Sequence, residues 1–408
     1  MSVEADDRAE DGATDGADGG AGDRWRDGKR YAWLCGLLVP LFPFAAWGLV
    51  EATGVGAFWW FGPFLVYVVL PSLDNVIGTT TLNPPDTAVS RLEHDRYYRY
   101  VTYAYLPLQY TGLALACWLW TRGGLSFWDK LGLAATIAMV AGIAINTAHE
   151  LGHKKDGLER WLSRIALAQS GYGHFYIEHN RGHHVRVATP EDPASSRMGE
   201  SFWRFLPRSV VGGLRSAWAL ERKRFARRGR SPWNHRNDIL NAWAMTLALY
   251  LALVAVFGLA VLPWLIVQAV WGFSLLEVVN YLEHYGLRRQ RMADGRYERT
   301  RPAHSWNANN MASNVFLYHL QRHSDHHANP TRRYQTLRHF DEAPQLPSGY
   351  ATMILLAYVP PLWRRVMDKR VVEHYRGDLT LASIEPGARD RILARHGVAD
   401  AAPNTTVA

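Results

Sequence analysis

Six long apolar segments alternate with stretches rich in charged side chains along this chain of 408 residues. Each segment is close to the ~20 residues that an α-helix needs to cross the hydrocarbon core of a bilayer. The segments cover roughly residues 31–50, 57–78, 101–121, 131–148, 240–258 and 260–281. A single run of this kind could be a buried helix of a soluble protein. Six of them predict an all-α, polytopic membrane protein with about six transmembrane helices.

The distribution of Lys and Arg predicts on which side of the membrane each connection lies. The connections 51–56, 121–124 and 258–262 are short and carry only Arg122. The Lys- and Arg-rich parts are the flank before the first segment, the loop 79–100, the region 150–239 and the chain after residue 284. Because basic connections remain in the cytoplasm, we expect an even number of spans, both termini in the cytoplasm and a location in the bacterial inner membrane.

We interpret the two ends of the chain as tails that flank one domain. Residues 1–23 are mostly Ala, Asp, Glu and Gly, a composition that cannot bury enough apolar surface to offset the entropy lost on ordering. This segment also lacks the basic start and small-residue cleavage site of a signal peptide. We therefore expect a disordered acidic tail over 1–23, one membrane-embedded domain over 24–385 and a C-terminal tail over 386–408.

Charge and cysteine content exclude several kinds of partner. The net charge of +8 is explained by the basic connections, so we expect no nucleic acid partner. The basic stretch 221–230 suits a helix facing anionic lipid heads, and a protein-docking patch is the alternative. The two cysteines, Cys35 and Cys117, both lie in apolar surroundings and can form neither a disulfide framework nor an iron–sulfur or rubredoxin centre. Any electron carrier must therefore be a separate protein.

Histidines gather at four places, each beside an apolar segment. They are His149 and His153, then His179, His183 and His184, then His284, and finally His323, His326 and His327. On a helix these spacings project the imidazoles from one side, so we expect His179 and His183, one turn apart, to converge on one centre. The predicted topology places all nine at the cytoplasmic mouth of the spans. Nine imidazoles are too many for one metal ion.

Neutral imidazole suits zinc, copper and iron, so the number of ligands must distinguish them. The stretch His149-Glu150-Leu151-Gly152-His153 matches the pattern of zinc metalloproteases, in which the glutamate is a general base. Such a site needs about three protein ligands and leaves both triple clusters unexplained. A metal transporter, the other alternative, usually carries ionisable groups inside its spans. Two irons sharing nine imidazoles is the hypothesis that uses every cluster, and such a site could oxidise an unactivated C–H bond.

At these residues the chain resembles the integral-membrane alkane hydroxylases (alkane 1-monooxygenases), in the group of histidine-box proteins that includes membrane fatty acid desaturases and hydroxylases. The motifs that carry the resemblance are His-Glu-Leu-Gly-His-Lys-Lys (149–155), Glu-His-Asn-Arg-Gly-His-His (178–184), Asn-Tyr-Leu-Glu-His-Tyr-Gly-Leu (280–287) and Leu-Gln-Arg-His-Ser-Asp-His-His (320–327). The similarity runs from about residue 30 to about 380 and includes Asn83-Pro-Pro85, the loop 188–200 and His304-Ser-Trp-Asn307.

The resemblance implies a function in some detail. It implies six membrane helices and a cytoplasmic catalytic region in which the nine histidines hold two non-haem iron ions, with dioxygen as co-substrate. The expected reaction is terminal hydroxylation of medium- to long-chain n-alkanes, with electrons from NADH delivered through rubredoxin reductase and rubredoxin. A membrane fatty acid desaturase or hydroxylase of the same group is the alternative.

Four carboxylates adjoin the expected ligands. They are Glu150, Glu178, Glu283 and Asp325. We expect them to orient imidazoles and to offset the charge of the metal centre, and the alternative is local ion pairing with nearby Arg and Lys. We expect His174 and His319, which lie near the boxes, to pack around the centre without being ligands.

An apolar substrate that partitions from the bilayer needs a path between the spans. If the second span is a continuous helix, Trp59, Pro63, Val66 and Leu70 share one face, and the resemblance implies that this helix lines the channel. Val66 is small enough to let a chain longer than about a dozen carbons pass. The fourth span offers a face of small residues, at Ala134, Ala138, Ala141 and Ala148. For Ala141 and its neighbours, close helix packing is the alternative to a channel wall.

Overall fold

The computed structural model describes residues 25–396, so the predicted acidic tail lies outside the described residues, as does the stretch 397–408. Within the described part, regular structure is helical and extended pairing is limited to isolated bridges. The all-α prediction is therefore confirmed.

Among residues 25–396, five helical segments are long and apolar enough to cross a membrane. They are Ala32–Thr53, Gly56–Ile77, Phe127–Gly152, Asp238–Phe257 and Leu259–His284. The remaining predicted span is helix α6 (Arg96–Thr121), whose 26 residues are about 39 Å long at 1.5 Å per residue. It is long enough to cross, but Arg96, Arg99, Gln109 and its many tyrosines make it less apolar than the other five. The multi-pass architecture is confirmed, with five segments meeting both criteria where we expected about six.

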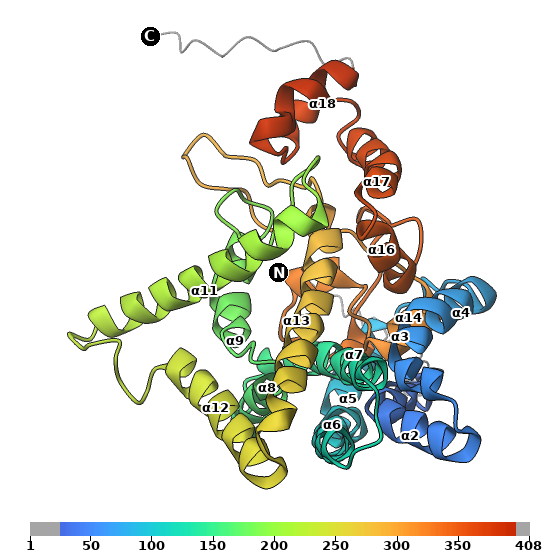
Figure 1. Ribbon diagram of the computed structural model, residues 1–408. Helices are drawn as coiled ribbons and strands as arrows, with labels where there is room; N and C mark the ends of the chain where they lie inside the picture. Colours follow the sequence, from blue (N-terminus) through green and yellow to red (C-terminus); the bar gives the residue numbers. More distant parts are fainter. Residues whose placement is uncertain (1–24, 397–408) are drawn as a thin grey trace, which may run out of the picture.

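Helix α7 (Phe127–Gly152) lies at the centre of the molecule. Its first turn is capped reciprocally, because the Ser126 hydroxyl accepts from the Asp129 N–H while the Asp129 carboxylate accepts from the Ser126 N–H. From Gly132 to Gly152 every residue of this helix is buried. Helix α13 (Leu262–His284) packs along it, as Figure 1 shows. An apolar helix that is buried on all sides needs such neighbours around its whole circumference.

The contact between α7 and α13 is close enough to require glycine. A Cβ atom on Gly142 would lie 3.0 Å from the carbonyl oxygen of Gly272, and one on Gly272 would lie 3.1 Å from the Cβ of Ala141. Small residues allow the two backbones to approach in this way. Ala141, which we expected in the channel, therefore lies in this helix contact, and its role in a channel stays a prediction.

The second span is not a continuous α-helix. It consists of a 3₁₀ turn η2 (Gly56–Trp60), α3 (Phe61–Phe64), a π-helical turn η3 (Leu65–Val69) and α4 (Leu70–Ile77). Each change of helix type changes the angle between successive side chains. Trp59 consequently packs with Leu113 and Ile137, on a different side from Val66 and Leu70, which line a cavity.

The remaining elements surround this centre. Helices α11 (Phe202–Ala226) and α12 (Asp238–Phe257) extend to the left in Figure 1, while α16 (Tyr350–Ala357) and α17 (Pro360–His374) cover the right. The first part of the predicted C-terminal tail forms α18 (Arg389–Arg395), whose Ile392 and Leu393 are buried. The other elements are η1 (Ala32–Leu41), α2 (Phe42–Thr53), α5 (Asp86–His94), α8 (Gly157–Ala168), α9 (Phe175–Glu178), η4 (His179–His183), α10 (His184–Arg186), η5 (Leu259–Val261), η6 (Pro302–His304), α14 (Met311–Phe316), α15 (His323–Ala328), η7 (Tyr334–Thr336), η8 (Leu379–Leu381) and η9 (Pro386–Ala388).

Candidate metal centre

The nine histidines singled out from the sequence come together in two groups. One nitrogen atom of each member lies within 4.8 Å of the corresponding atom of every other member of its group. The five-histidine cluster contains His149, His153, His179, His184 and His326. The four-histidine cluster contains His183, His284, His323 and His327. Helices α7 and α13 carry His149 and His284 at their C-terminal ends, so both spans deliver a ligand to the same end of the molecule.

The imidazole nitrogens of each cluster point toward one another. In the five-histidine cluster, the Nε2 atom of His184 lies 3.0 Å from the Nε2 atoms of both His179 and His326. In the four-histidine cluster, the Nε2 atom of His323 lies 2.9 Å from that of His327 and 3.2 Å from that of His284. Nitrogens that face each other across such short distances suit a cation between them.

Unpaired nitrogens support the same reading. The Nε2 atoms of His149, His153 and His183 are buried and have no hydrogen-bond partner within residues 25–396. Buried polar atoms are normally paired, so these three are explained if each binds a metal ion. The donor set of both clusters thus fits metal ions that imidazole prefers.

The protonation state of the clusters also fits metal binding. Burial lowers the pKa of His179, His184 and His326 well below its ordinary value, and the neighbouring imidazoles lower it further. Burial and neighbouring imidazoles have the same effect on the pKa of His323 and His327. These side chains are therefore neutral near pH 7, and neutral imidazole is the form that binds a metal.

The second histidine box, which contains His179, His183 and His184, is divided between the clusters by a π-helical turn. Element η4 (His179–His183) is π-helical, and a π-helix brings residues i and i+5 to the same side. His179 and His184 accordingly share the five-histidine cluster, while His183 belongs to the other. Our expectation that His179 and His183 converge on one centre assumed an α-helix and differs from the structure for this reason.

The third box achieves a similar division with ordinary α-helix. In α15, His323 and His327 are four residues apart and share the four-histidine cluster, while His326 joins the five-histidine cluster. The two clusters adjoin where the rings of His184 and His327 face each other, with centroids 4.4 Å apart. Each triple box thus contributes to both centres.

Two members of the four-histidine cluster make a polar contact through their Nδ1 atoms. The Nδ1 atom of His183 lies 2.9 Å from the carboxylate of Asp192, and that of His284 lies 3.2 Å from the carbonyl oxygen of His304. An Nδ1–H that donates in this way leaves Nε2 free to bind a metal. Burial raises the pKa of Asp192, but His183 and the Ser195 hydroxyl outweigh it, so the pKa lies below its usual range.

Asp192 was not identified from the sequence. It lies in the loop 188–200 beside another acid, Glu191, and only the fold shows which of the two reaches a ligand. The only available signal was the position of this loop shortly after the second box.

Three of the four carboxylates that we did identify are paired with cations. The pairs are Glu150 with Lys154 at 2.9 Å, Glu178 with Arg186 at 2.6 Å and Asp325 with Arg332 at 2.7 Å. The fourth, Glu283, lies against the four-histidine cluster, with one oxygen 3.2 Å from the Nε2 atom of His323. The geometry favours local ion pairing for the first three, and the orienting role of the set stays a prediction.

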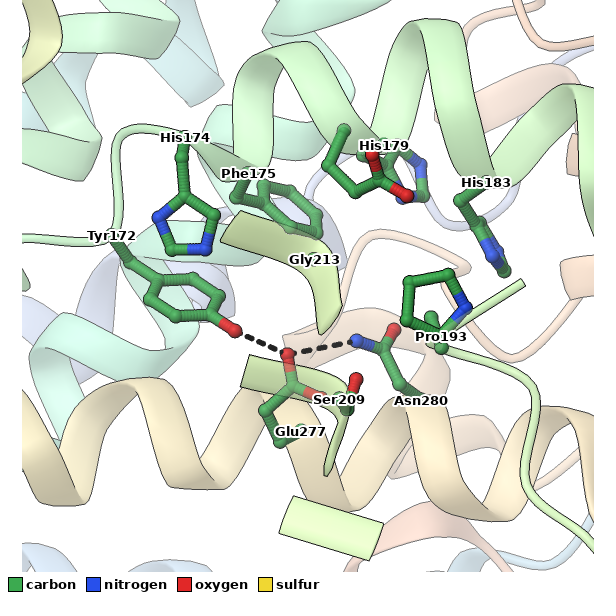
Figure 2. A pocket seen from close by; sticks show the side chains of 12 residues that line it. Tyr172, His174, Phe175, His179, His183, Pro193, Ser209, Gly213, Glu277 and Asn280 are labelled. Atoms are coloured by element: carbon green, nitrogen blue, oxygen red, sulfur yellow. Dashed lines mark hydrogen bonds between the residues drawn. The ribbon is translucent and has the colours of Figure 1, made fainter. Parts of the chain in front are cut away.

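A polar pocket adjoins both clusters (Figure 2). The Tyr172 hydroxyl donates to the Glu277 carboxylate at 2.6 Å, and the Asn280 amide donates to the same oxygen at 3.4 Å. His179 and His183 contribute to the wall of this pocket, as do Glu178 and His174. His174 and His319 both lie outside the two clusters.

A separate apolar cavity shares no lining residue with the polar pocket. This inner cavity is lined by Val66, Leu70, Ile143, Asn146 and Leu320, together with Gly142, Leu275, Leu276, Val279, Leu317, Ala351 and Ile354. Asn146 precedes His149 by about one turn of α7, and Leu320 lies three residues before His323, so part of the cavity wall lies near the metal centre.

An outer cavity of about 170 Å³ shares Val66, Leu70 and Ile143 with the inner one. Its other walls include Leu38 and Phe42 of the first span and Leu73 of the second. The two cavities are therefore neighbours that share a wall, and Val66 belongs to that wall. Of the four predicted channel residues, Val66 and Leu70 line both cavities, and the channel role of all four stays a prediction.

Comparison with known proteins gives the class and then the family. The sequence model of the fatty acid desaturase family matches residues 125–357, which contain all nine histidines. The fold and the site therefore define a histidine-box membrane protein of that class.

Three curated relatives are alkane 1-monooxygenases. The protein from Acinetobacter baylyi is 48% identical over 382 residues, which cover 92% of each chain. The protein from Pseudomonas putida is 46% identical over 369 residues, or 90% of this chain and 92% of the relative. The protein from Ectopseudomonas oleovorans is 46% identical over 376 residues, or 92% and 94%. The chain belongs to the alkane 1-monooxygenase family and is an oxidoreductase.

Proposed function

We propose that this chain hydroxylates the terminal carbon of medium- to long-chain n-alkanes to primary alcohols, with two non-haem iron ions and dioxygen. The observation that carries the proposal is the pair of adjoining histidine clusters near two neighbouring apolar cavities, the outer of which is lined by residues of the first two spans. The names of the curated relatives support the same substrate and reaction.

The nine histidines would hold the two irons, five donors on one and four on the other. When bound, these ions supply the activation of dioxygen and the oxidation of the C–H bond. The reaction consumes the alkane, dioxygen, two electrons and two protons, and it yields the alcohol and water. The chain itself must therefore bind the alkane, exclude water from its path and admit protons and electrons.

The inner cavity binds and orients the substrate. Its walls are almost entirely aliphatic, so a hydrocarbon chain leaves the bilayer without losing an apolar environment. Val66 and Ile143 confine the chain laterally where the outer and inner cavities meet. Because Asn146 and Leu320 mark the end near the clusters, a chain that enters end-on presents its terminal carbon to the metal centre.

The polar pocket is the proposed source of protons. Glu277 is held there by Tyr172 and Asn280, and one oxygen of Glu178 in the same pocket is buried without a hydrogen-bond partner among the described residues. These carboxylates can hold water and pass protons toward His179 and His183 without opening the apolar path. Polar and apolar access thus reach the centre from different sides.

Electrons must come from another protein. Neither Cys35 nor Cys117 is paired, and they lie in different core clusters, so they offer no redox centre. We propose a separate rubredoxin, reduced by an NADH-dependent rubredoxin reductase, at the cytoplasmic face of the bacterial inner membrane. Exposed cations such as Arg222, Lys223 and Arg227 would attract a small acidic donor. When electron delivery limits the rate, turnover should therefore fall as salt rises.

Product analysis tests the proposed reaction. Cells that express the full chain with a rubredoxin system and receive an n-alkane should form the primary alcohol, and cells expressing the His184→Ala variant serve as the control. An unsaturated acyl chain in place of the alcohol would favour the fatty acid desaturase that the matching family model also allows. Purified protein with one zinc and no iron would overturn the proposal and favour a metalloprotease.

A further inference from the structure

The carboxylate of Glu283 lies beside the four-histidine cluster and approaches it at His323, although it is not one of the four donors that lie within 4.8 Å of one another. Around the Nε2 atom of His323, the Nε2 atom of His327 is at 2.9 Å, that of His284 at 3.2 Å and the Glu283 Oε2 atom at 3.2 Å. The oxygen therefore approaches His323 as closely as a fellow cluster member does. Glu283 directly precedes His284 in α13, so the same helix end brings both residues to the cluster.

The approach of this oxygen differs from an ordinary hydrogen bond to a ligand. His183 and His284 are held by contacts at Nδ1, the ring atom that points away from their cluster. Glu283 instead meets the Nε2 atom of His323, while the Nδ1 atom of that ring is buried without a partner within residues 25–396. A nitrogen that binds a metal carries no proton to donate. If His323 binds a metal through this nitrogen, the Glu283 oxygen would therefore face the metal ion and not an N–H group.

Charge leads to the same assignment. Glu283 is 1% exposed, and in the part of the chain that the structure describes its carboxylate pairs with no Lys or Arg. Among the described residues, its other oxygen accepts only from the Tyr350 hydroxyl, at 3.1 Å. A buried carboxylate is costly unless it is paired or coordinates a metal. The cation proposed for the four-histidine cluster is the compensating charge within reach.

We propose that Glu283 is a metal ligand, which gives the four-histidine site a fifth donor. Both ions would then have five protein donors, all nitrogen in one site and four nitrogens with one oxygen in the other. The inference rests on the proposed function, because it requires that both clusters bind metal ions. It adds that the two ions are chemically distinct.

Mössbauer spectroscopy and iron analysis of the full chain, purified in lipid nanodiscs after growth on ⁵⁷Fe, test the inference without relying on turnover. The parent should hold two irons per chain, with two quadrupole doublets of equal area. In Glu283→Gln, which preserves side-chain size, one doublet should shift or disappear with loss of up to half the iron, while the other doublet stays unchanged. In Glu283→Asp, which keeps the charge on a shorter arm, the same doublet should be altered with both irons retained.

Glu150→Gln is the matched control, because Glu150 is also a buried acid next to a cluster histidine but is paired with Lys154. It should keep both doublets. If Glu283→Gln keeps both irons and both doublets, the inference is overturned while the proposed function stands. If the parent binds no iron, the proposed function fails first. Should Glu283→Gln not fold, the Glu283→Asp spectrum decides in the same way: two unchanged doublets overturn the assignment.

Discussion

The five-histidine and four-histidine clusters adjoin each other, yet their surroundings differ in charge. Glu150, Glu178 and Asp325 are neighbours in sequence of five-histidine ligands, and each is neutralised by a Lys or Arg. Beside the four-histidine cluster, Asp192 and Glu283 instead contact the imidazoles themselves. The four-histidine site therefore has anionic partners that the five-histidine site lacks.

This difference indicates a division of roles between the two sites. Anionic groups near a metal stabilise its more highly charged state, and hydrogen-bonded carboxylates make imidazole a stronger donor. We expect the ion in the four-histidine site to be the more readily oxidised of the two. The ion surrounded only by neutral imidazoles should favour the reduced state.

The largest effect should come from removing one ligand from either cluster. His184→Ala and His327→Ala delete facing rings from the two sites. Each should lower alcohol formation by more than the roughly 10–100-fold typical of losing an outer partner, and each should release iron from its own site first. Iron analysis with product assays measures both. His174→Ala, outside the clusters, should keep its iron, and a ligand variant with full iron and parental turnover would disprove the shared centre.

Removal of the Asp192 carboxylate should have the next largest effect. Asp192→Asn leaves His183 without its anionic partner, so iron affinity or turnover should fall roughly 10–100-fold. Competition with a chelator of known affinity measures the iron loss. Glu191→Gln changes the adjacent acid, whose side chain is 49% exposed, and should have little effect. If the two variants had the same iron affinity and turnover, Asp192 would not contribute to the difference between the two sites.

Narrowing the apolar path should change the substrate and leave both clusters as they are. Val66→Trp places a large ring where the inner and outer cavities meet, so the preference should shift from chains longer than about a dozen carbons to shorter ones, since a bulky ring leaves less space. Product profiles over a series of n-alkanes measure the shift, with iron content as the check. Val68→Trp lies in the same π-helical turn but is 51% exposed, and should keep the parental profile. An unchanged profile in Val66→Trp would leave the length preference unassigned.

Replacement of Lys29 should have the smallest effect on the metal centre, because Lys29 contacts His319, which lies outside both clusters. Burial, with help from Arg322, lowers the pKa of Lys29 to about 7, and its amino group lies 2.7 Å from the Nε2 atom of His319. The unfolded chain, with an ordinary lysine pKa near 10.5, binds more protons between about pH 7 and pH 10.5, so stability should rise with pH across that range.

Lys29→Met should remove this rise without changing iron content. Unfolding temperature measured against pH tests it, and Lys155→Met, at an exposed position, should keep the parental slope. If Lys29→Met lost iron, His319 and its partner would belong to the metal centre after all.

The sequence allowed the prediction of the elements that depend on long patterns. The apolar segments gave the spanning helices, because crossing a bilayer requires a length and composition that few other structures share. The nine histidines were found because so many imidazoles beside apolar segments have few other uses. Helix α6 shows where the composition rule weakens, since it is packed among other helices and buries Gln109 and tyrosines such as Tyr105 against them.

The features that escaped prediction depend on single turns and on contacts between distant segments. The change from 3₁₀ to π-helix in the second span separates Trp59 from Val66, and no periodicity in the sequence marks it. Asp192 cannot be distinguished from Glu191 before the loop 188–200 is placed against His183. The pairing of Glu150 with Lys154 was an alternative that the sequence left open, and the burial of both side chains makes that pair the dominant contact.

The π-helical turn at His179–His183 also suggests how the spacing of such a box can vary. The second box has one more residue between its first and second histidines than the third, yet each gives two imidazoles to one site and one to the other. Inserting one residue into an α-helical turn converts it into a π-bulge and leaves the flanking turns in phase. Box length and helix type are therefore interchangeable, and a chain that gained or lost one residue here could keep every ligand in place.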